Sequence, residues 1–294
     1  MMDYKAIACL RQIIESQSFE KAGDVLGLTQ SAVSQKIKKL ELEYGAPLLI
    51  REKPISLTKV GRSLLAHFIK VEMMEQKLLS QTRESSVIQR IPVAINNDSL
   101  ATWFMYVLTE FSENTDIRIQ LKTADQSQAR KLLQKGEVVA SISDVGTPVA
   151  GGDSVFLGDF QYVLVASPSY IKKYLGESIT TTAVANSPAL MFDGYDELWG
   201  RCQREILAVD VNVNQCHWLP SSQGFVEMVL AGTVCALIPR IQIQQELMRG
   251  ELIELFPHKC LSIPLYWHWY KLDSLALDRL TKLVIAKATL ALYK

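Results

Sequence analysis

The chain has 294 residues, 48 % of them hydrophobic, and its 31 basic side chains balance 31 acidic ones. This length suffices for sizeable cores in two or three domains, and no apolar run approaches the roughly 18 residues of a membrane span. Five dispersed cysteines without a CxxC pair are typical of reduced thiols, with a redox sensor as the alternative. We therefore expect a soluble cytoplasmic protein that has no membrane partner.

Three helices are expected near the N-terminus. Over residues 3–17 apolar side chains recur at helical spacing, which predicts a supporting helix. A second helix over residues 19–26 has Ser18 as its N-cap, and Gly27 supplies the permissive backbone of a tight turn. Thr29 caps a third helix, which ends at the next glycine. The last two helices form a helix-turn-helix.

The third helix has an outward polar face. Its members are Gln30, Ser31, Ser34, Gln35 and Lys38. Short hydrogen-bonding side chains followed by cations are the order that a helix needs to read base edges in the major groove and to bind phosphates. An ordinary helical hairpin with a solvated polar face is the alternative, and the pattern alone does not separate the two.

The residues after the third helix favour DNA binding. Two short apolar segments flank Arg51-Glu52-Lys53-Pro54, which predicts a two-stranded wing that closes on Thr58, the cap of the next helix. Residues 29–62 contain seven Lys or Arg and three Asp or Glu, whereas residues 91–294 contain 17 basic and 21 acidic side chains. A cationic head on a mildly acidic body suits phosphate contact by the head alone. The sequence thus predicts a winged helix-turn-helix.

The head resembles the DNA-binding domain of the LysR-type transcriptional regulators. The matching residues are Ala22, Thr29 to Ser34, Leu40-Glu41, Pro47 to Leu49, Arg51, Leu57-Thr58 and Gly61. The resemblance implies that the polar face meets the bases of double-stranded DNA, with RNA polymerase as a further partner. The expected DNA-binding residues are Thr29, Gln30, Ser31, Ser34, Gln35 and Lys38, with Arg51 and Lys53 on the wing.

A long helix is predicted from residue 58 to about residue 84. Six of its side chains repeat at alternating spacings of four and three: Val60, Leu64, His67, Val71, Met74 and Leu78. Such a heptad seam requires a partner, and the LysR resemblance implies antiparallel pairing with the linker helix of another subunit. Burial against the chain's own body is the alternative. We interpret His67 as a packing residue rather than a pH switch, and residues 81–90 as a polar hinge.

From residue 91 the chain alternates short apolar strands with amphipathic helices. Strands are expected over residues 91–95, 117–121, 138–143, 162–167, 189–192, 235–238 and 261–269. Helices are expected over residues 99–111, 126–135, 170–175, 225–232 and 276–293. This order predicts mostly parallel sheets in two subdomains with a cleft between them. It is the arrangement of periplasmic binding proteins and of LysR-type effector domains.

Ligands of an open α/β sheet bind beyond the carboxyl ends of strands, at helix N-termini. Three loops are expected in such places, at residues 96–99, 192–196 and 220–223. Hydroxyls and helix N-termini suit a carboxylate, while aspartates suit an ammonium or guanidinium group. Together the loops suit an amino acid with a cationic side chain. For each aspartate, capping or turn formation is the alternative.

The body is similar to the ArgP and LysG branch of the LysR family, whose members respond to arginine and lysine. The stretches that carry this likeness are residues 97–103, 136–139, 216–217, 221–222, 238–253 and 266–268. Asp193 and Asp196 match acidic positions of that branch, whereas residues 143–147 depart from it and offer Asp144 as an added cation ligand. The expected effector-binding residues are Asn97, Asp98, Ser99, Asp144, Asp193, Asp196, Ser221 and Ser222.

Catalytic and metal sites are not expected. Ser169 and Lys172 fit an SxxK spacing, but the accompanying catalytic motifs are absent from the sequence, so Ser169 is better interpreted as an N-cap. Only Cys216-His217 places two soft ligands together, which is too few for a metal site. We therefore expect no enzyme activity and no cofactor.

The expected architecture has an all-α head, a long helix and an α/β effector domain. The domains are a winged helix-turn-helix at residues 1–58, a linker and dimerisation helix with its hinge at 59–90, and the effector domain at 91–294, with subdomain I at 91–166 and 265–294 and subdomain II at 167–264. The expected function is transcriptional regulation by a homodimer or homotetramer that senses lysine or arginine and controls genes such as a basic amino acid exporter. A ligand-indifferent architectural DNA binder is the alternative.

Overall fold

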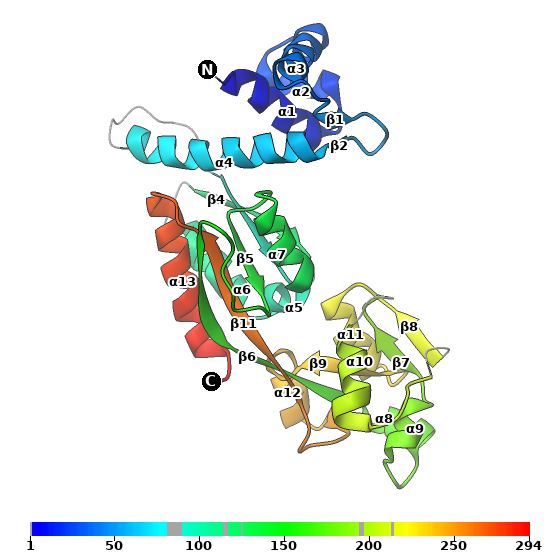
Figure 1. Ribbon diagram of the computed structural model, residues 1–294. Helices are drawn as coiled ribbons and strands as arrows, with labels where there is room; N and C mark the ends of the chain where they lie inside the picture. The colour runs from blue at the N-terminus through cyan, green and yellow to red at the C-terminus, as the bar shows by residue number, and fades with distance from the viewer. Residues whose placement is uncertain (1, 81–89, 114–116, 125, 194–196, 213–214) are drawn as a thin grey trace.

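The computed structural model describes residues 2–80, 90–113, 117–124, 126–193, 197–212 and 215–294. Figure 1 shows a small helical head, the long helix α4 (Lys59–Ser80) and an α/β body with two lobes, which we call subdomains I and II. The expected winged helix-turn-helix and two-subdomain body are confirmed. The expected hinge lies outside the described residues, except for residue 90, which begins a strand.

The head is a three-helix unit built around the helix-turn-helix. Its helices are α1 (Tyr4–Ser16), α2 (Phe19–Leu26) and α3 (Gln30–Tyr44). Ser18 Oγ accepts a hydrogen bond from Lys21 N, and Thr29 Oγ1 accepts one from Ala32 N, so both expected N-caps are confirmed. The core of the head includes Ala6, Ile7, Leu10, Ile13, Ala22, Val33, Ile37 and Leu40.

Two glycines shape the turn between α2 and α3. Gly27 has a φ of 65°, a left-handed conformation that glycine adopts at little cost. A Cβ on Gly23 would lie 2.5 Å from Leu28 O, so only glycine lets the α2 backbone approach the turn this closely. Ala22 beside it is fully buried, as expected of a small residue between the two helices.

The wing is an antiparallel ribbon of β1 (Leu49–Ile50) and β2 (Ser56–Leu57). Thr58 joins the wing to α4, because its hydroxyl donates to Pro47 O at 2.7 Å and accepts from Gly61 N at 3.1 Å. The sequence therefore predicted both the wing and the helix cap that follows it.

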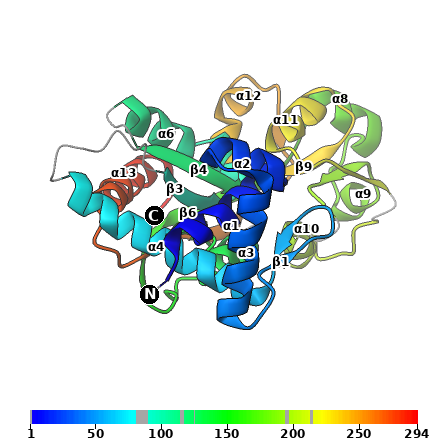
Figure 2. The ribbon, with the colours of Figure 1, turned by 90° about the horizontal axis from the view of Figure 1, so that it is seen from above.

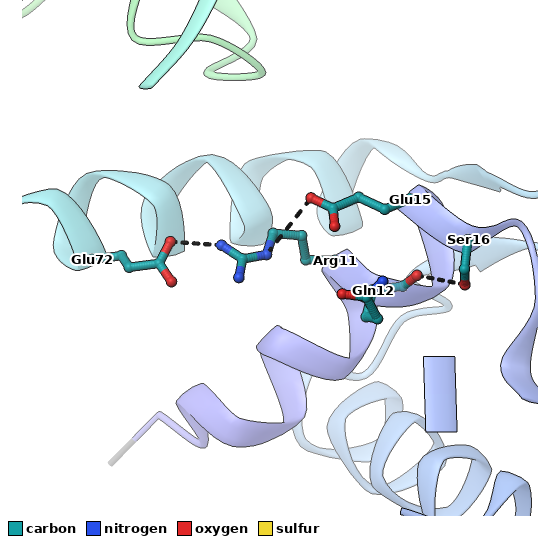
Figure 3. A network of polar contacts seen from close by, with 5 residues as sticks. All are labelled: Arg11, Gln12, Glu15, Ser16 and Glu72. Atoms are coloured by element: carbon teal, nitrogen blue, oxygen red, sulfur yellow. Dashed lines mark hydrogen bonds and ion pairs between the residues drawn. The ribbon is translucent and has the colours of Figure 1, made fainter. Parts of the chain in front are cut away.

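Helix α4 packs on the head along one part of its length and on the body along another. Leu64 and Phe68 belong to the core of the head, while Met73 is 2 % exposed in the core of the body. Figure 3 shows Arg11 of α1 reaching Glu72 of α4, with Nη1 2.6 Å from Oε2. These contacts fix α1 against the long helix.

Much of the expected heptad seam on α4 is uncovered within one chain. Its exposed members are Val60, His67 and Met74. Leu64 is buried against the head, Val71 is half-buried, and the side chain of Leu78 lies outside the described part of the structure. The body instead packs on Met73, which is not a seam residue. The described seam is thus not buried against the chain's own body.

One sheet, with nine strands in the described residues, runs through the body. Its strand order is β4-β3-β5-β11-β6-β9-β7-β8, and β10 pairs with β6. The strands are β3 (Arg90–Ile95), β4 (Arg118–Thr123), β5 (Ala140–Ser143), β6 (Gly152–Ala166), β7 (Ala189–Met191), β8 (Cys216–Trp218), β9 (Cys235–Pro239), β10 (Ile253–Glu254) and β11 (Leu261–Tyr270).

Helices cover the sheet in both subdomains. In subdomain I they are α5 (Asn97–Ala101), α6 (Phe104–Glu113), α7 (Gln126–Gln134) and α13 (Leu275–Ala291). In subdomain II they are α8 (Pro168–Tyr170), α9 (Thr181–Ala185), α10 (Glu197–Cys202), α11 (Ser222–Leu230) and α12 (Gln244–Met248), with π-helical turns η1 (Ile171–Leu175) and η2 (Gln203–Leu207) and the 3-10 turn η4 (Arg240–Gln242). Figure 2 shows α6 and α13 together at one end of the molecule, and these helices pack on each other.

The sheet is mixed, so the expectation of mostly parallel sheets is wrong. Strand β3 pairs in parallel with β4 and β5, and β7 with β8 and β9, but β6 and β11 run antiparallel to their neighbours. These two strands have 15 and 10 residues and extend from one subdomain into the other. Because one leads out and the other leads back, they pair in opposite directions.

The connection between the subdomains lies within these long strands. Residues 162–165 of β6 pair with β9, whereas residues 152–156 pair with residues 266–270 of β11. The register of the two strands shifts between Leu265 and Tyr266. The expected subdomain boundaries at 166–167 and 264–265 lie near these places and stay predictions.

The single helix expected over residues 99–111 is two helices, α5 and α6. The break falls at Thr102, which has φ −121° and ψ −105°. Its hydroxyl donates to Asp98 O at 2.6 Å and so closes the end of α5. Threonine competes with the helical backbone in this way, which explains a break that apolar periodicity does not reveal.

Candidate functional site: the outer face of the head and the cleft

Helix α3 presents polar side chains on the outside of the head. The exposed members are Gln30, Ser31, Gln35 and Lys38. Ser34 is half-buried. Thr29 Oγ1 caps the helix by accepting from Ala32 N at 3.2 Å, and it lies 3.0 Å from Ser31 Oγ. The hydrogen-bonding groups therefore lie at the leading end of the helix, with a cation further along.

The wing places a second set of cations beside this face. Arg51 Nη2 lies 3.6 Å from Glu41 Oε2, and the guanidinium carbon lies 5.6 Å from the centre of the Phe19 ring. The Arg51 side chain is still 51 % exposed, so it can bind a phosphate while Glu41 sets its direction. Lys53 is exposed on the same wing.

A cavity of about 710 Å³ lies between the two subdomains, within the usual size range of ligand pockets. Its charged lining residues are the acids Asp98, Asp144, Asp193 and Glu197 and the cations Lys131 and Arg201. Subdomain I contributes the β3–α5 turn, α7 and the end of β5, and subdomain II contributes α10 and α11. The cavity therefore combines both signs of charge, with acids in excess.

Asp98 connects the two subdomains across this cavity. Its Oδ2 accepts a hydrogen bond from Tyr162 OH at 2.6 Å, and its Oδ1 accepts one from Ser222 Oγ at 2.7 Å. Burial raises the pKa of the Asp98 carboxyl above its ordinary value, and the two hydrogen bonds offset part of that rise. Asp98 belongs to α5 and Ser222 to α11, so this contact bridges the subdomains.

The hydrogen-bond network around Ser222 accommodates a neutral Asp98. Ser222 Oγ lies 2.7 Å from Asp98 Oδ1 and 3.1 Å from Gln242 Oε1, but a hydroxyl has only one proton to donate. Gln242 Nε2 donates to Ser222 O at 3.1 Å, which fixes the orientation of the amide. If Asp98 is protonated, it donates to Ser222 and Ser222 donates to Gln242, so each short oxygen–oxygen contact has a proton.

The structure brings five of the eight expected effector-binding residues to the cavity: Asn97, Asp98, Asp144, Asp193 and Ser222. Ser99 is fully buried, and Ser221 caps α11 by accepting from Gly224 N at 3.1 Å. Neither of these two serines is among the described residues that line the cavity. Asp196 lies outside the described residues.

Several lining residues escaped the sequence analysis. They include Tyr162, Lys131, Glu197, Arg201 and Gln242. Tyr162 lies inside a strand, where the apolar pattern signals only core, and α10 and η4 have no clear sequence signature. The excess of acidic residues just before α10 was the one signal that could have indicated Glu197.

Other kinds of site receive no support from the described residues. They contain no group of three or more His, Cys, Asp or Glu that could hold a metal ion. Ser167, not Ser169, is the N-cap of α8, since it accepts from Tyr170 N at 3.3 Å; Ser169 Oγ lies 2.9 Å from Ser167 Oγ. Among the described helices, none combines the length and apolar character that crossing a membrane requires.

Two family models match the chain. The model of the LysR substrate binding domain matches residues 86–287, and that of the bacterial regulatory helix-turn-helix protein, lysR family, matches residues 4–62. The chain belongs to the LysR family. LysR regulators bind DNA and small-molecule effectors, and the family and its relatives are transcriptional regulators rather than enzymes. This LysR-family chain is accordingly a DNA-binding transcriptional regulator.

Individual relatives agree with the expected branch of the LysR family. The HTH-type transcriptional regulator ArgP of Pseudomonas aeruginosa (strain UCBPP-PA14) is 36 % identical over 291 residues, which cover 98 % of this chain and 96 % of the relative. The crystal structure of ArgP from Mycobacterium tuberculosis superposes with a TM-score of 0.83 at 30 % identity, covering 100 % of this chain and 99 % of that one. The full-length LysG from Corynebacterium glutamicum with bound effector Arg gives 0.73 at 31 % identity, with both chains fully covered.

Proposed function

We propose that the effector of this LysR-type regulator is arginine or lysine, bound in the cleft between the subdomains. The observation that carries the proposal is the lining of the cleft, which holds four acids and two cations around a cavity of about 710 Å³. An amino acid with a cationic side chain has one carboxylate and two cationic groups, so it complements such a lining. The LysG relative with its bound Arg supports the same choice.

Asp98 and Ser222 are the proposed centre of the effector site, with Asn97, Asp144 and Asp193 around it. The bridge between Asp98 and Ser222 means that a ligand in the cleft meets groups of both subdomains at once. A ligand that binds one arrangement of the subdomains better than another shifts their equilibrium by that difference in affinity. Effector binding would thereby bias the arrangement of the DNA-binding heads.

The proposed DNA contacts divide between reading bases and binding phosphates. Gln30, Ser31, Ser34 and Gln35 would read base edges, while Lys38, Arg51 and Lys53 would bind phosphates.

Two heads are needed for spaced half-sites, so we propose a homodimer or homotetramer joined through α4. We also propose that the regulator is cytoplasmic, has RNA polymerase as a partner and controls a basic amino acid exporter.

A thermal-shift screen of the full chain against the common amino acids tests the effector. A ligand that binds only the folded state raises the melting temperature. We expect arginine or lysine to do so, and we expect Asp98→Ala and Ser222→Ala to abolish the shift. Glu227→Ala, an exposed change on the same helix as Ser222, is the matched control and should keep it.

Two other outcomes of the screen would contradict the proposal. Stabilisation by a different metabolite would keep the regulator and replace the effector. No stabilisation by any amino acid, with sequence-specific DNA binding intact, would favour the ligand-indifferent architectural binder.

A further inference from the structure

The loop between β5 and β6 brings the carboxylate of Asp144 to the cleft. Asp144 directly follows β5, is half-buried and lines the cavity. Within the described residues no hydrogen bond reaches its carboxylate. A half-buried carboxylate that faces a cavity in this way is an acceptor for the N–H groups of a ligand.

The loop that carries Asp144 is held by hydrogen bonds at three consecutive carbonyls. Val145 O accepts from His268 Nε2 at 2.8 Å, Gly146 O accepts from Ser154 Oγ at 2.6 Å, and Thr147 O accepts from Arg130 Nη2 at 3.0 Å. These donors come from β11, β6 and α7, so three separate elements fix one short loop. We call His268, Ser154 and Arg130 the loop bracket.

Packing adds to the bracket at Gly146. A Cβ at this position would lie 2.8 Å from Cε1 of the Tyr266 ring, so the glycine lets the loop lie directly on the aromatic face. Ser143 Oγ accepts from Val145 N at 3.3 Å and lies 3.0 Å from His268 Nε2. The backbone on both sides of Asp144 is therefore restrained.

His268 has the chemistry of a permanent donor in this bracket. It is fully buried, and burial lowers the pKa of its imidazole, which keeps the ring neutral. A neutral ring carries one N–H, and the 2.8 Å contact to Val145 O places that proton on Nε2. His268 therefore holds the loop without adding a positive charge beside Asp144.

Among the described residues that line the cavity, the arginine is Arg201, and its guanidinium already has partners. Arg201 Nε donates to Glu205 Oε1 at 2.8 Å, and its Nη2 lies 3.3 Å from Ser262 O. Glu205 is also the largest cause of the raised pKa of Arg201, with Asp144 a smaller one. Asp144 thus lies near a cation that another carboxylate holds, and it lines the cavity itself.

We propose that Asp144, held in place by the loop bracket, binds the distal cationic group of the effector and selects charged side chains against neutral isosteres. The inference rests on the proposed function and names the residue that sets its specificity. A charged hydrogen-bonding partner on a preorganised carboxylate is worth about tenfold to hundredfold in affinity over a neutral one. His268 and Ser154 are positioning residues for Asp144.

Arginine and citrulline provide the test, because citrulline replaces the guanidinium by a neutral urea of similar shape. Calorimetric titration of the full chain should give a Kd for citrulline about tenfold to hundredfold above that for arginine. Asp144→Asn should reduce this ratio to nearly one. Asp210→Asn, which removes an exposed aspartate of subdomain II outside the cavity lining, is the matched control and should leave the ratio unchanged.

The bracket is tested by its own variants. Ser154→Ala frees Gly146 O and should lower the ratio severalfold while the chain remains folded. His268→Ala should act in the same direction, and His268→Gln, which restores an N–H donor near Val145 O, should recover the ratio. A merely structural role of His268 would change the melting temperature without changing the selectivity between the two ligands.

The outcomes separate this inference from the function on which it rests. If the wild-type chain binds neither arginine nor lysine, both the proposed effector and the role of Asp144 are overturned. If arginine binds but Asp144→Asn keeps the full preference over citrulline, only the role of Asp144 is overturned. A loss of preference in Asp193→Asn alone would assign the distal cation to Asp193.

Discussion

Asp98 links the two subdomains through its hydrogen bond with Ser222, and burial of its ionised carboxylate costs free energy of folding. A carboxyl whose pKa is raised on folding is easier to ionise in the unfolded chain than in the folded one. Below its ordinary value of 3.8 both states hold the proton and the cost is absent. The cost grows as the pH rises through the raised pKa of the folded state, and it is complete above that pKa.

We predict that Asp98→Asn stabilises the effector-free chain at neutral pH. The amide can accept from Tyr162 and donate to Ser222, as the neutral acid does, without the cost of a buried charge. We expect a gain in the free energy of unfolding at pH 7, because the amide has no charge to desolvate. Urea unfolding of both proteins between pH 3.5 and pH 8 measures it.

The pH profile distinguishes this cause from ordinary repacking. The gain should vanish toward the acidic end, where Asp98 is protonated in both states. A gain that is equal at all pH values, or a loss at pH 7, would show that ionisation of Asp98 is not what limits stability.

Substitution of a base-reading side chain should affect DNA affinity differently from substitution of a phosphate-binding one. Gln30→Ala should lower affinity for the specific operator by about tenfold to hundredfold, since a base contact is lost, and should leave non-specific binding unchanged. Lys38→Ala should weaken both kinds of binding and reduce the slope of log affinity against log salt by about one. Gel shifts at several salt concentrations with competitor DNA measure both. Equal effects of the two substitutions on both kinds of DNA would contradict the division.

At the scale of elements, the helix-turn-helix depends on a close backbone approach. Gly23→Ala would place a methyl group against Leu28 O, so we predict a loss of about 1–3 kcal/mol in the stability of the head and a loss of DNA binding. Chemical unfolding followed by a DNA-binding assay measures the effect. Gly200→Ala is the matched control, because a Cβ there meets only the flexible end of Arg204 at 3.5 Å. Similar behaviour of the two variants would contradict the steric argument.

The head could be predicted from sequence almost residue by residue, because its signals are local. Ser18 and Thr29 cap their helices within a few residues of themselves, and Gly27 marks the turn between them. The body could not, because its topology depends on pairings between distant segments. The sequence of the first half of β6 does not predict that this segment pairs with β11, more than 100 residues later.

The cleft was predictable where polar residues interrupt an apolar pattern and not elsewhere. Asp98 and Ser222 stand at the beginning of helices, so their position indicated a ligand site. Tyr162 and Gln242 complete the same network from a strand and a 3-10 turn, where sequence gives no reason to expect a polar contact. The bracket around Asp144 likewise requires β11 and α7 to converge on one loop, which only the fold reveals.

At the scale of the whole molecule, α4 leaves part of its heptad seam exposed. Val60, His67 and Met74 are spaced by seven residues and are exposed in the single chain. We predict that Met74→Lys dissociates the proposed oligomer, because a charge in this exposed seam would oppose packing against a partner helix. Sedimentation velocity at several protein concentrations measures the change. Glu75→Lys, an exposed neighbour outside the seam, should leave the assembly intact, and equal dissociation by both would contradict pairing through this seam.

The path from the cleft to the head can be followed through packed contacts. Lys131 of α7 lines the cavity, and a Cβ on Gly136 just after this helix would overlap the side chain of Ala66 on α4. Lys70 of α4 lies 3.5 Å from the centre of the Tyr270 ring on β11. Subdomain I and α4 therefore touch directly, and Arg11 joins α4 to the head at Glu72.

Strands β6 and β11 have a consequence for the way a signal leaves subdomain II. Subdomain I contains both β3, where the chain enters the body, and α13. Subdomain II is therefore an insertion, connected to subdomain I through the neighbouring strands β6 and β11. The backbone of subdomain II is connected to the head only through subdomain I, which holds both β3 and α13. Any effect of a ligand on subdomain II would therefore reach the head through subdomain I, either along β6 and β11 or across the cleft.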